Sequence, residues 1–195
     1  PVHWVAKRND VEELRRLLDE EPGLLEEGVG WPRDQPLHVA CDEGCMEAAC
    51  FLLDRGAGVN NRNRFEMTPL MHACRLGRVG VVGLLLARGA DPTLRDEHSR
   101  TALMWASWGA EHPGSDHVAV IRLLLEDGRV LVDARESDGR TALSLACYNQ
   151  YTERARVLLL EGRADLSIAD SGGMTPMARA RRRICQETVR LLKVR

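Results

Sequence analysis

The stretch TPLMHACRLGRVGVVGLLLARGADP, residues 68–92, contains the pattern that decides the fold. Thr68 has the hydroxyl of a helix N-cap, and Pro69 suits the first helical position because the N–H it lacks has no partner there. The apolar residues that follow predict a short helix ending at Gly77. VGVVGLLLARG then predicts a second helix, which Gly89 ends in the left-handed conformation. The stretch therefore predicts two helices joined by a tight turn.

The same pattern recurs along the chain at nearly constant intervals. Further copies begin at Gln35 (QPLHVACDEG), Thr101 (TALMWASWG), Thr141 (TALSLACYNQ) and Thr175 (TPMARARRR), and a degenerate copy, VHWVAKRNDVEELRRLL, begins at Val2. Successive starts from Gln35 onward lie 33, 33, 40 and 34 residues apart. One helix pair cannot bury its own apolar face, whereas stacked pairs share a continuous core. Six such units therefore predict a solenoid.

This pattern resembles the ankyrin repeat, whose period is about 33 residues and whose signature is T-P-L-H-x-A. The resemblance covers nearly the whole chain. It implies an all-α solenoid of stacked antiparallel helix pairs with β-hairpin-like finger loops, forming a single domain over residues 1–195. We number its repeats as units 1 to 6, at approximately residues 1–34, 35–67, 68–100, 101–140, 141–174 and 175–195. It also implies a non-catalytic module that binds a protein or peptide in the groove between fingers and first helices.

The resemblance also says which residues line that groove: the finger tips before each Thr, and the seventh and eighth residues after it. In this sequence they are Trp31, Asp42, Glu43, Phe65, Met67, Arg75, Leu76, His98, Arg100, Trp108, Asp138, Arg140, Tyr148, Asn149, Met174, Arg182 and Arg183. Three other aromatic residues, Trp4, Phe51 and Trp105, are expected in the core. Acidic residues in unit 2 and basic ones in unit 6 predict that a ligand's basic end lies toward Glu43 and its acidic end toward Arg182.

Three departures from the repeat pattern carry further expectations. Glu66 and Ser99 stand where the finger usually has glycine, so those two turns are expected to be looser or differently shaped. Gln150 replaces the glycine between the two helices of unit 5. Gly56, Gly128 and Gly162 are expected to end second helices in the same way as Gly89. Cys41, Cys74 and Cys147 share one position, which predicts small buried side chains.

An insertion of about six residues lengthens unit 4. GAEHPGSD, residues 109–116, separates its two helices, and Pro113 with Gly114 prevents helix continuation. The region holds four residues of metal-ligand type: Glu111, His112, Asp116 and His117. A surface loop rarely supplies the rigid support of a metal site, so we expect a solvated loop without metal and interpret Asp116 as an N-cap. Deleting residues 110–115 is expected to cost little stability, since doubling a loop's length costs about 0.6 kcal/mol.

Composition and charge limit the remaining possibilities. The chain has 27 basic and 29 acidic residues and six cysteines. We expect reduced thiols in an intracellular protein, cytoplasmic or nuclear, without a signal peptide or membrane span. We expect a monomer without a cofactor. The segment RARRR, residues 179–183, suggests a second possibility, a nucleic-acid- or nucleus-associated module, although a polar cap on the last unit explains it as well. A third possibility is the targeting or regulatory region of a larger enzyme.

Overall fold

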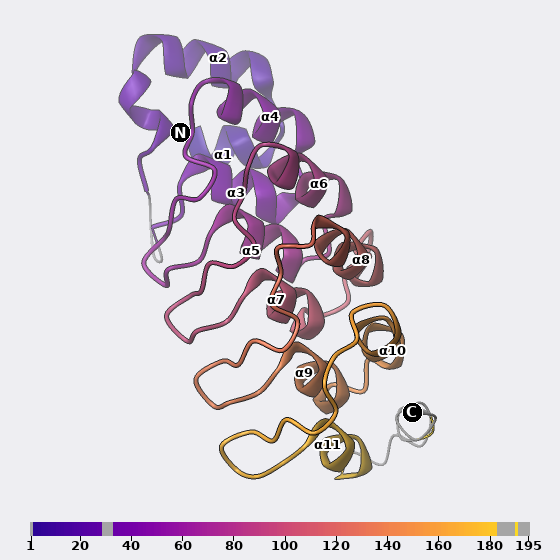
Figure 1. The fold of residues 1–195 in the computed structure, drawn as a ribbon. Coiled ribbons are helices and arrows are strands. Elements are labelled where there is room, and N and C mark those ends of the chain that lie inside the picture. Colours follow the sequence, from indigo (N-terminus) through magenta and orange to yellow (C-terminus); the bar gives the residue numbers. More distant parts are fainter. Residues whose placement is uncertain (1, 29–32, 183–189, 191–195) are drawn as a thin grey trace.

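The structure, a computed structural model, describes residues 2–28, 33–182 and 190. Helices make up 53% of the chain, and the described part contains no strand. The helices stack in pairs into a curved solenoid, with the finger loops along one edge (Figure 1). The predicted all-α repeat architecture is therefore confirmed.

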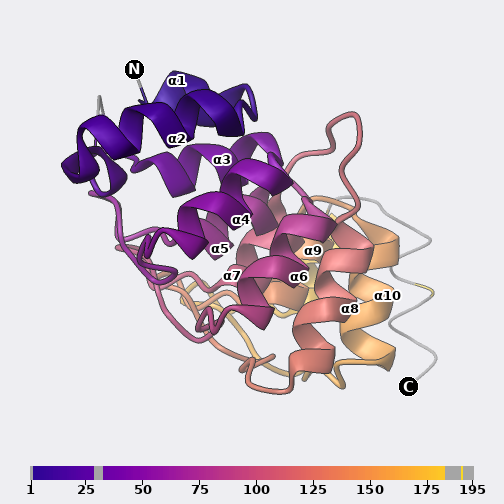
Figure 2. The ribbon, with the colours of Figure 1, turned by 90° about the horizontal axis from the view of Figure 1, so that it is seen from above.

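The helices form two layers. The first helices of the units form the inner layer, beside the fingers: α1 (Val2–Lys7), α3 (Pro36–Glu43), α5 (Pro69–Arg75), α7 (Ala102–Trp108), α9 (Ala142–Tyr148) and α11 (Pro176–Arg182). The second helices form the outer layer: α2 (Val11–Glu20), α4 (Met46–Asp54), α6 (Val79–Ala87), α8 (His117–Asp127) and α10 (Thr152–Leu160). A short 3-10 helix, η1 (Pro22–Leu25), follows α2. Figure 2 shows both layers from above.

The inner helices begin at threonine caps, as predicted. The hydroxyl oxygens of Thr68, Thr101, Thr141 and Thr175 each accept a hydrogen bond from the backbone N–H three residues later, at 3.2–3.4 Å. Each cap satisfies one of the N–H groups that a helix start leaves without a partner. The repeated threonine therefore sets where α5, α7, α9 and α11 begin, whereas Gln35 takes its place before α3.

Glycine ends most of the outer helices. Gly56, Gly89 and Gly128 have φ values of 94°, 85° and 75°, as predicted for left-handed caps. The same prediction is wrong for Gly162, because Arg163 takes the left-handed conformation instead, with φ of 54°. Gly162 is needed for space: a Cβ there would lie 2.8 Å from the carbonyl oxygen of Leu158.

The fingers share one turn despite their different sequences. Glu66 and Ser99 adopt φ of 58° and 62°, close to the 76° and 73° of Gly139 and Gly173. In each finger, the N–H of this residue donates to the carbonyl three residues earlier, at 2.7–3.0 Å. The expectation of looser or different turns at Glu66 and Ser99 is therefore wrong. Backbone hydrogen bonds between neighbouring fingers, such as Glu97 N–H to Phe65 O at 3.1 Å, fix this geometry.

The core runs continuously through the stack. Cys41, Cys74 and Cys147 are fully buried, as predicted, and the five cysteines in the described residues are free thiols. Of the three aromatic residues expected in the core, Phe51 and Trp105 are half-buried. The prediction is wrong for Trp4, which is 60% exposed on α1, with the Arg8 guanidinium over its ring.

Candidate functional site

The inner helices end in a row of equivalent residues on the groove side. Asp42, Arg75, Trp108 and Tyr148 each lie seven residues after the start of their unit. Trp108 and Tyr148 end α7 and α9, and each is 39% exposed. α5, α7 and α9 pack side by side, so these residues form consecutive steps along the stack.

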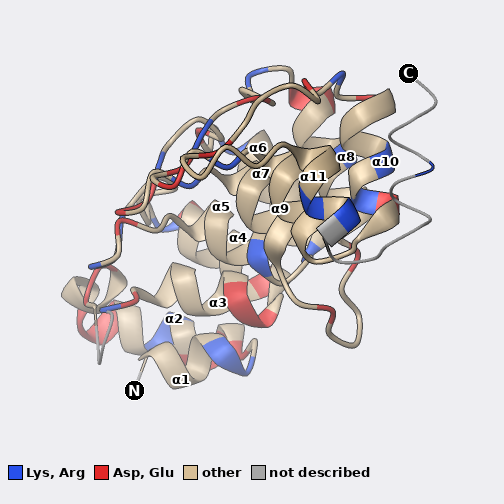
Figure 3. Ribbon diagram, turned by 90° about the horizontal axis from the view of Figure 1, so that it is seen from below, with Lys and Arg blue, Asp and Glu red and all other residues tan. Residues whose placement is uncertain are grey.

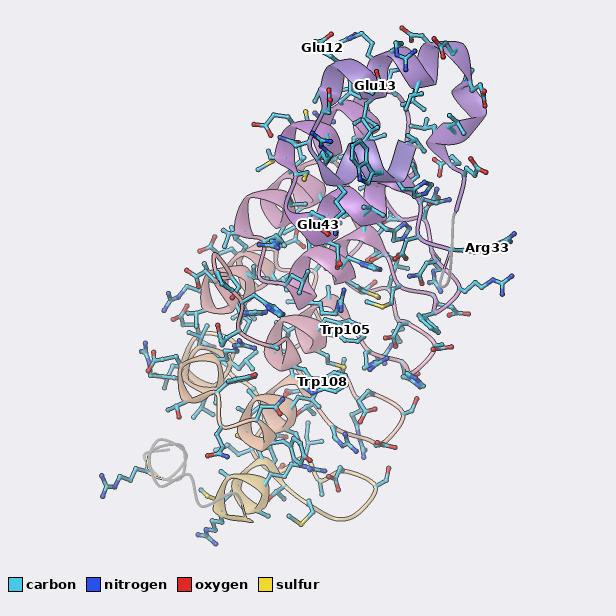
Figure 4. All side chains as sticks on the ribbon, turned by 180° about the vertical axis from the view of Figure 1, so that it is seen from behind. Glu12, Glu13, Arg33, Glu43, Trp105 and Trp108 are labelled. Atoms are coloured by element: carbon cyan, nitrogen blue, oxygen red, sulfur yellow. The ribbon has the colours of Figure 1, made fainter. Side chains whose placement is uncertain are left out.

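An arginine and two tryptophans form the most ordered aromatic cluster of the groove. The rings of Trp105 and Trp108 stack with their centres 5.4 Å apart, and Figure 4 shows both on α7. The Arg100 guanidinium lies over both rings, 4.2 Å from the centre of Trp105 and 5.3 Å from that of Trp108. Such cation–π contacts contribute about 0.5–1 kcal/mol at exposed sites.

A buried carboxylate holds this cluster in place. Asp96 accepts hydrogen bonds from Arg100 Nε at 2.9 Å and Trp105 Nε1 at 3.1 Å. It also accepts the backbone N–H groups of His98 and Arg100, both at 2.9 Å. Charge-assisted hydrogen bonds to a buried carboxylate are among the stronger ones in proteins. Asp96 therefore fixes the orientation of Arg100 and Trp105 before any partner protein binds, and Trp108 stacks on Trp105.

A cavity of about 510 Å³ opens beside this cluster. It is lined by fingers and inner helices of neighbouring units, namely by Asp34, Asn63, Phe65, Met67, His72, Arg75, Glu97, His98, Arg100 and Trp105. The structure thus brings together five of the predicted groove residues: Phe65, Met67, Arg75, His98 and Arg100. Met67 is itself buried, so it forms part of the cavity wall but offers little surface to a ligand.

The floor of this cavity is a polar network between units 2 and 3. Asp42 accepts hydrogen bonds from Arg75 Nη2 at 2.6 Å and His72 Nδ1 at 3.1 Å. Burial raises the pKa of Asp42, but the hydrogen bond from His72 and the charge of Arg75 outweigh it, so its pKa lies below the usual value. Asn63 links this network to Asp34 at 2.7 Å. Asp42 is therefore a charged anchor for Arg75.

His38 lies where unit 2 meets unit 3, and its ring packs edge-to-face on that of His72, with the ring centres 5.3 Å apart. Its Nε2 lies 3.1 Å from the carbonyl oxygen of Met67, and its Nδ1 accepts the Gln35 N–H at 3.3 Å. These partners require a neutral ring with the proton on Nε2. Burial and the neighbouring His72 lower the pKa of His38 to about 4.

A second cavity of about 430 Å³ lies between the fingers of units 4 and 5. Its lining includes three predicted groove residues, Asp138, Arg140 and Met174. Arg140 donates to the Asp138 carboxylate at 2.5 Å. Arg179, from α11, also lines it and forms an ion pair with the buried Asp170.

The remaining predicted groove residues are placed less uniformly. Leu76, Asn149 and Tyr148 lie at or just after the ends of α5 and α9, partly exposed. Glu43 forms an ion pair with Lys7 at 2.5 Å, so its charge is already compensated. Trp31, Arg183 and the side chain of Arg182 lie outside the described residues. Figure 3 shows acidic residues at the end of α3 and basic residues on α11.

Several cavity residues were not predicted as site residues. Trp105 was expected in the core, whereas Asp34, Asn63, His72 and Glu97 were not considered as groove positions. His72 and Trp105 share one position, four residues after the unit start, and this position faces the fingers. This shared position in the repeat is the feature of the sequence from which both residues could have been predicted.

The inserted loop, residues 109–116, uses its polar groups within the protein. Asp116 caps α8 by accepting the Ala119 N–H at 2.8 Å, as predicted. His117 is buried, and its Nε2 lies 3.0 Å from the carbonyl oxygen of Arg75. Burial lowers the pKa of His117. The described residues contain no group of three or more side chains that could hold a metal ion.

The loop also holds a buried cation. Arg154, from α10, is 2% exposed. Its guanidinium donates to the carbonyl oxygens of Gly109 at 2.6 Å and Ala106 at 3.2 Å, and forms an ion pair with Glu111. Residues 110–114 are exposed, as expected of a solvated loop, but the loop has a further role: Gly109 and Glu111 supply partners to an arginine that is otherwise buried.

Comparison with known proteins agrees with this architecture. Among the described residues, no helix is long and apolar enough to cross a membrane. The chain is 40% identical over 123 residues to a probable E3 ubiquitin-protein ligase XBOS33 of Oryza sativa subsp. japonica, which covers 63% of this chain and 22% of that protein. It is 31% identical over 174 residues to a putative E3 ubiquitin-protein ligase XBAT31 of Arabidopsis thaliana, covering 83% and 38%.

A human relative, ankyrin repeat and SOCS box protein 16, is 38% identical over 159 residues, covering 79% of this chain and 33% of that protein. The chain thus spans less than two fifths of the length of each of these relatives. The family model described as "Ankyrin repeats (3 copies)" matches residues 37–132 and 115–194. With that match and the stacked helix pairs described above, the chain belongs to the ankyrin-repeat family.

Proposed function

We propose that the groove between the fingers and the inner helices binds a segment of a partner protein without catalysing a reaction. Ankyrin repeats are non-catalytic protein-interaction modules. The observation that carries the proposal is the cluster of Arg100, Trp105 and Trp108 beside the 510 Å³ cavity. Tryptophan and arginine held in a fixed orientation are the residue types that contribute most binding energy at protein interfaces.

The proposed contact surface is the set of predicted groove residues, with Trp105, Asn63 and His72 added from the cavity lining. The Asp42–Arg75 and Glu43–Lys7 pairs bear on the proposed ligand polarity. Because these acidic residues already have basic partners, the attraction of unit 2 for a ligand's basic end is weakened. We still propose this ligand polarity, and it depends mainly on the binding of the ligand's acidic end at unit 6.

We also propose that the chain serves as the recognition region of a larger protein. The reported relatives are more than twice as long as this chain, and two are named as E3 ubiquitin-protein ligases. In such a protein, the groove would select the partner while another region performs any reaction. The free cysteines support a place in the cytoplasm or nucleus. We further propose that the chain itself is monomeric.

Nucleic-acid binding through the basic end is the weaker alternative. Arg179, the first residue of the basic segment, forms an ion pair with Asp170 and lies over the Tyr148 ring. Its charge is therefore engaged within the protein. A salt titration separates the two functions, because binding driven by phosphate contacts weakens steeply as salt rises.

The groove proposal is tested by selecting binding peptides from a random display library with the whole chain. Binding of the selected peptides is then compared between the parent and the double variant Phe65→Ala/Trp108→Ala. We expect a loss of more than about 2 kcal/mol, roughly thirtyfold in Kd, since both side chains face the groove.

Leu160→Ala is the matched control, because Leu160 is an exposed apolar residue of the outer helix α10. Circular dichroism checks that each variant keeps its helix content. If the selected peptides bind the double variant as tightly as the parent, the groove is not the binding site.

A further inference from the structure

Two carboxylates of the 510 Å³ cavity have no lysine or arginine partner in the described part of the chain. Asp34 comes from the loop before α3, and Glu97 comes from the finger of unit 3. Asp34 accepts a hydrogen bond from the Asn63 amide at 2.7 Å. The Glu97 carboxylate lies 3.7 Å from His98 Nε2, too far for a hydrogen bond. Because a carboxylate has about four acceptor sites, both can accept further donors.

The two arginines of the cavity wall do not cancel this negative charge. Arg75 donates to Asp42 at 2.6 Å, and Arg100 donates to Asp96 at 2.9 Å. Each arginine thus has a carboxylate of its own, in addition to the two that line the cavity. His72 adds no charge, because its Nδ1 donates to Asp42 and its Nε2 accepts a hydrogen bond from an asparagine amide at 3.3 Å. The excess charge at the cavity is therefore negative.

Aromatic residues give the same cavity an apolar wall. Phe65 comes from the finger of unit 2 and Trp105 from α7, and both are half-buried. Trp105 is held in place by its hydrogen bond to Asp96 at 3.1 Å. Lysine and arginine side chains have a long apolar stem and a charged end, and they pack the stem on apolar surface while the end keeps polar partners. The cavity offers both kinds of surface to one such side chain.

Other occupants match the cavity less well. An apolar side chain would take water from the two available carboxylates without replacing its hydrogen bonds, which is costly for charged groups. An acidic side chain or a phosphate would be repelled by those carboxylates, and it would compete with Asp42 and Asp96 for the arginines. A basic side chain supplies charged donors to the available acceptors, and hydrogen bonds between charged partners are stronger than neutral ones.

We infer that this cavity binds a lysine or arginine side chain of the partner segment. The charged end pairs with Asp34 and Glu97. The apolar stem lies against Phe65 and Trp105. This inference rests on the proposed function of the groove. It places a basic residue of the ligand near unit 2, in agreement with the proposed ligand polarity.

The test uses peptides selected from the random display library with the whole chain. We expect each to contain a basic residue whose neutral replacement, citrulline for arginine or norleucine for lysine, raises the Kd at least about tenfold in fluorescence anisotropy. In Asp34→Asn/Glu97→Gln, the same replacement is expected to change the Kd by about twofold or less, because the variant side chains keep their shape but carry no charge.

Glu12→Gln/Glu126→Gln is the matched control, because it removes two charges from exposed positions on the outer helices α2 and α8. This variant should discriminate between the charged and neutral peptides as the parent does. Circular dichroism checks that both double variants keep their helix content. The comparison of the two peptides on the parent needs no variant, so it tests the inference even if a variant fails to fold.

Three results overturn the inference. They are selected peptides that need no basic residue, peptides that need an acidic residue at this cavity instead, and discrimination that Asp34→Asn/Glu97→Gln leaves unchanged. If the peptides lose affinity for Phe65→Ala/Trp108→Ala but need no basic residue, only this inference fails. If they are also indifferent to Phe65→Ala/Trp108→Ala, the proposed groove fails with it.

Discussion

The connection between the two helices differs sharply between unit 3 and unit 4. In unit 3, three residues, 76–78, join α5 to α6, and Gly77 adopts φ of 66° in a tight turn. In unit 4, the eight residues 109–116 join α7 to α8 and project from the side opposite the fingers (Figure 2). Both connections place the following outer helix at the same position in the stack.

The difference shows how an insertion becomes part of a repeat stack. The loop contacts the preceding unit, where the Asp116 N–H donates to Gly77 O at 3.0 Å. It contacts the following unit through Glu111 and Arg154. Arg154 is the third residue of α10, and the third residue of α6 is Val81, an ordinary core residue. An arginine is tolerated there because the loop of unit 4 supplies its partners.

Deleting residues 110–115 is expected to have the largest effect on this comparison. The deletion leaves two connecting residues in unit 4, close to the three of unit 3, but it removes Glu111 and leaves the buried Arg154 without its carboxylate. We expect the free energy of unfolding to fall by about 3 kcal/mol, because a buried charged donor loses its partner. Urea denaturation followed by circular dichroism measures this loss.

The same deletion combined with Arg154→Val is the matched control. Because valine resembles the Val81 of unit 3, we expect this variant to recover most of the lost stability. A deletion that costs less than about 1 kcal/mol on its own would show that the loop is a passive spacer, as first expected.

Acidification is expected to weaken the junction between units 2 and 3 rather than the loop junction. His38 must stay neutral to accept the Gln35 N–H, and its pKa is lowered to about 4. The unfolded chain binds the proton more readily, with a pKa near 6.5. The stabilising contribution of neutral His38 is therefore fully present above pH 6.5. It is lost as the pH drops toward 4, which lowers the free energy of unfolding by up to about 3 kcal/mol.

Denaturation curves recorded from pH 7.5 to pH 4.5 measure this dependence. In His38→Gln, the titrating group is absent, so the slope over this range should become shallower. An unchanged slope would mean that His38 does not control the acid sensitivity of that junction.

Removing the cap after the loop is expected to have a smaller effect. In unit 4, Asp116 accepts the Ala119 N–H at 2.8 Å, whereas the N-cap of α6, Arg78, makes no side-chain cap bond. Asp116→Ala should cost about 1 kcal/mol, and Asp116→Asn, which keeps an acceptor, considerably less. Thermal denaturation of both variants checks this. Equal losses would indicate that Asp116 contributes through its charge rather than as a cap.

The smallest expected effect concerns the fingers, which keep one turn in units 2 to 5 despite the different helix connections. Glu66 and Ser99 adopt left-handed conformations that side chains disfavour. Glu66→Gly and Ser99→Gly should each raise the free energy of unfolding by about 0.5 kcal/mol, because relief of strain exceeds the added chain entropy. Gly139→Ala should lower it. If both glycine variants lose stability, the side chains of Glu66 and Ser99 contribute contacts that outweigh the strain.

The repeating residues made most of the fold predictable. The threonine caps, the apolar positions and the glycine ends recur in each regular unit, so one interpreted unit predicted its neighbours. Failures came where the environment of a unit differs from the average. Trp4 is exposed in unit 1, the degenerate copy of the repeat, and Arg163 replaces Gly162 as the left-handed residue after α10.

The candidate site was predictable only in part. Phe65, Arg75 and Arg100 followed from the register of the repeat, and the structure brings them to one cavity. The pairing of Glu111 with Arg154 could not be predicted, because an insertion has no counterpart in the repeat and the two residues lie 43 positions apart. Side-chain networks of this kind depend on three-dimensional proximity rather than on periodic spacing.

The inserted loop adds contacts from unit 4 to both of its neighbours in the stack. In a repeat protein where each unit contacts only its neighbours, local opening proceeds inward from the ends, one unit at a time. Residues 109–116 contact unit 3 at Gly77 and unit 5 at Arg154, so opening unit 4 disturbs both neighbours at once. We therefore expect units 3, 4 and 5 to open together, and their backbone amides to exchange with solvent hydrogen more slowly than those of unit 1. The part of the protein that carries Trp108 and Tyr148 is thus expected to exchange slowly.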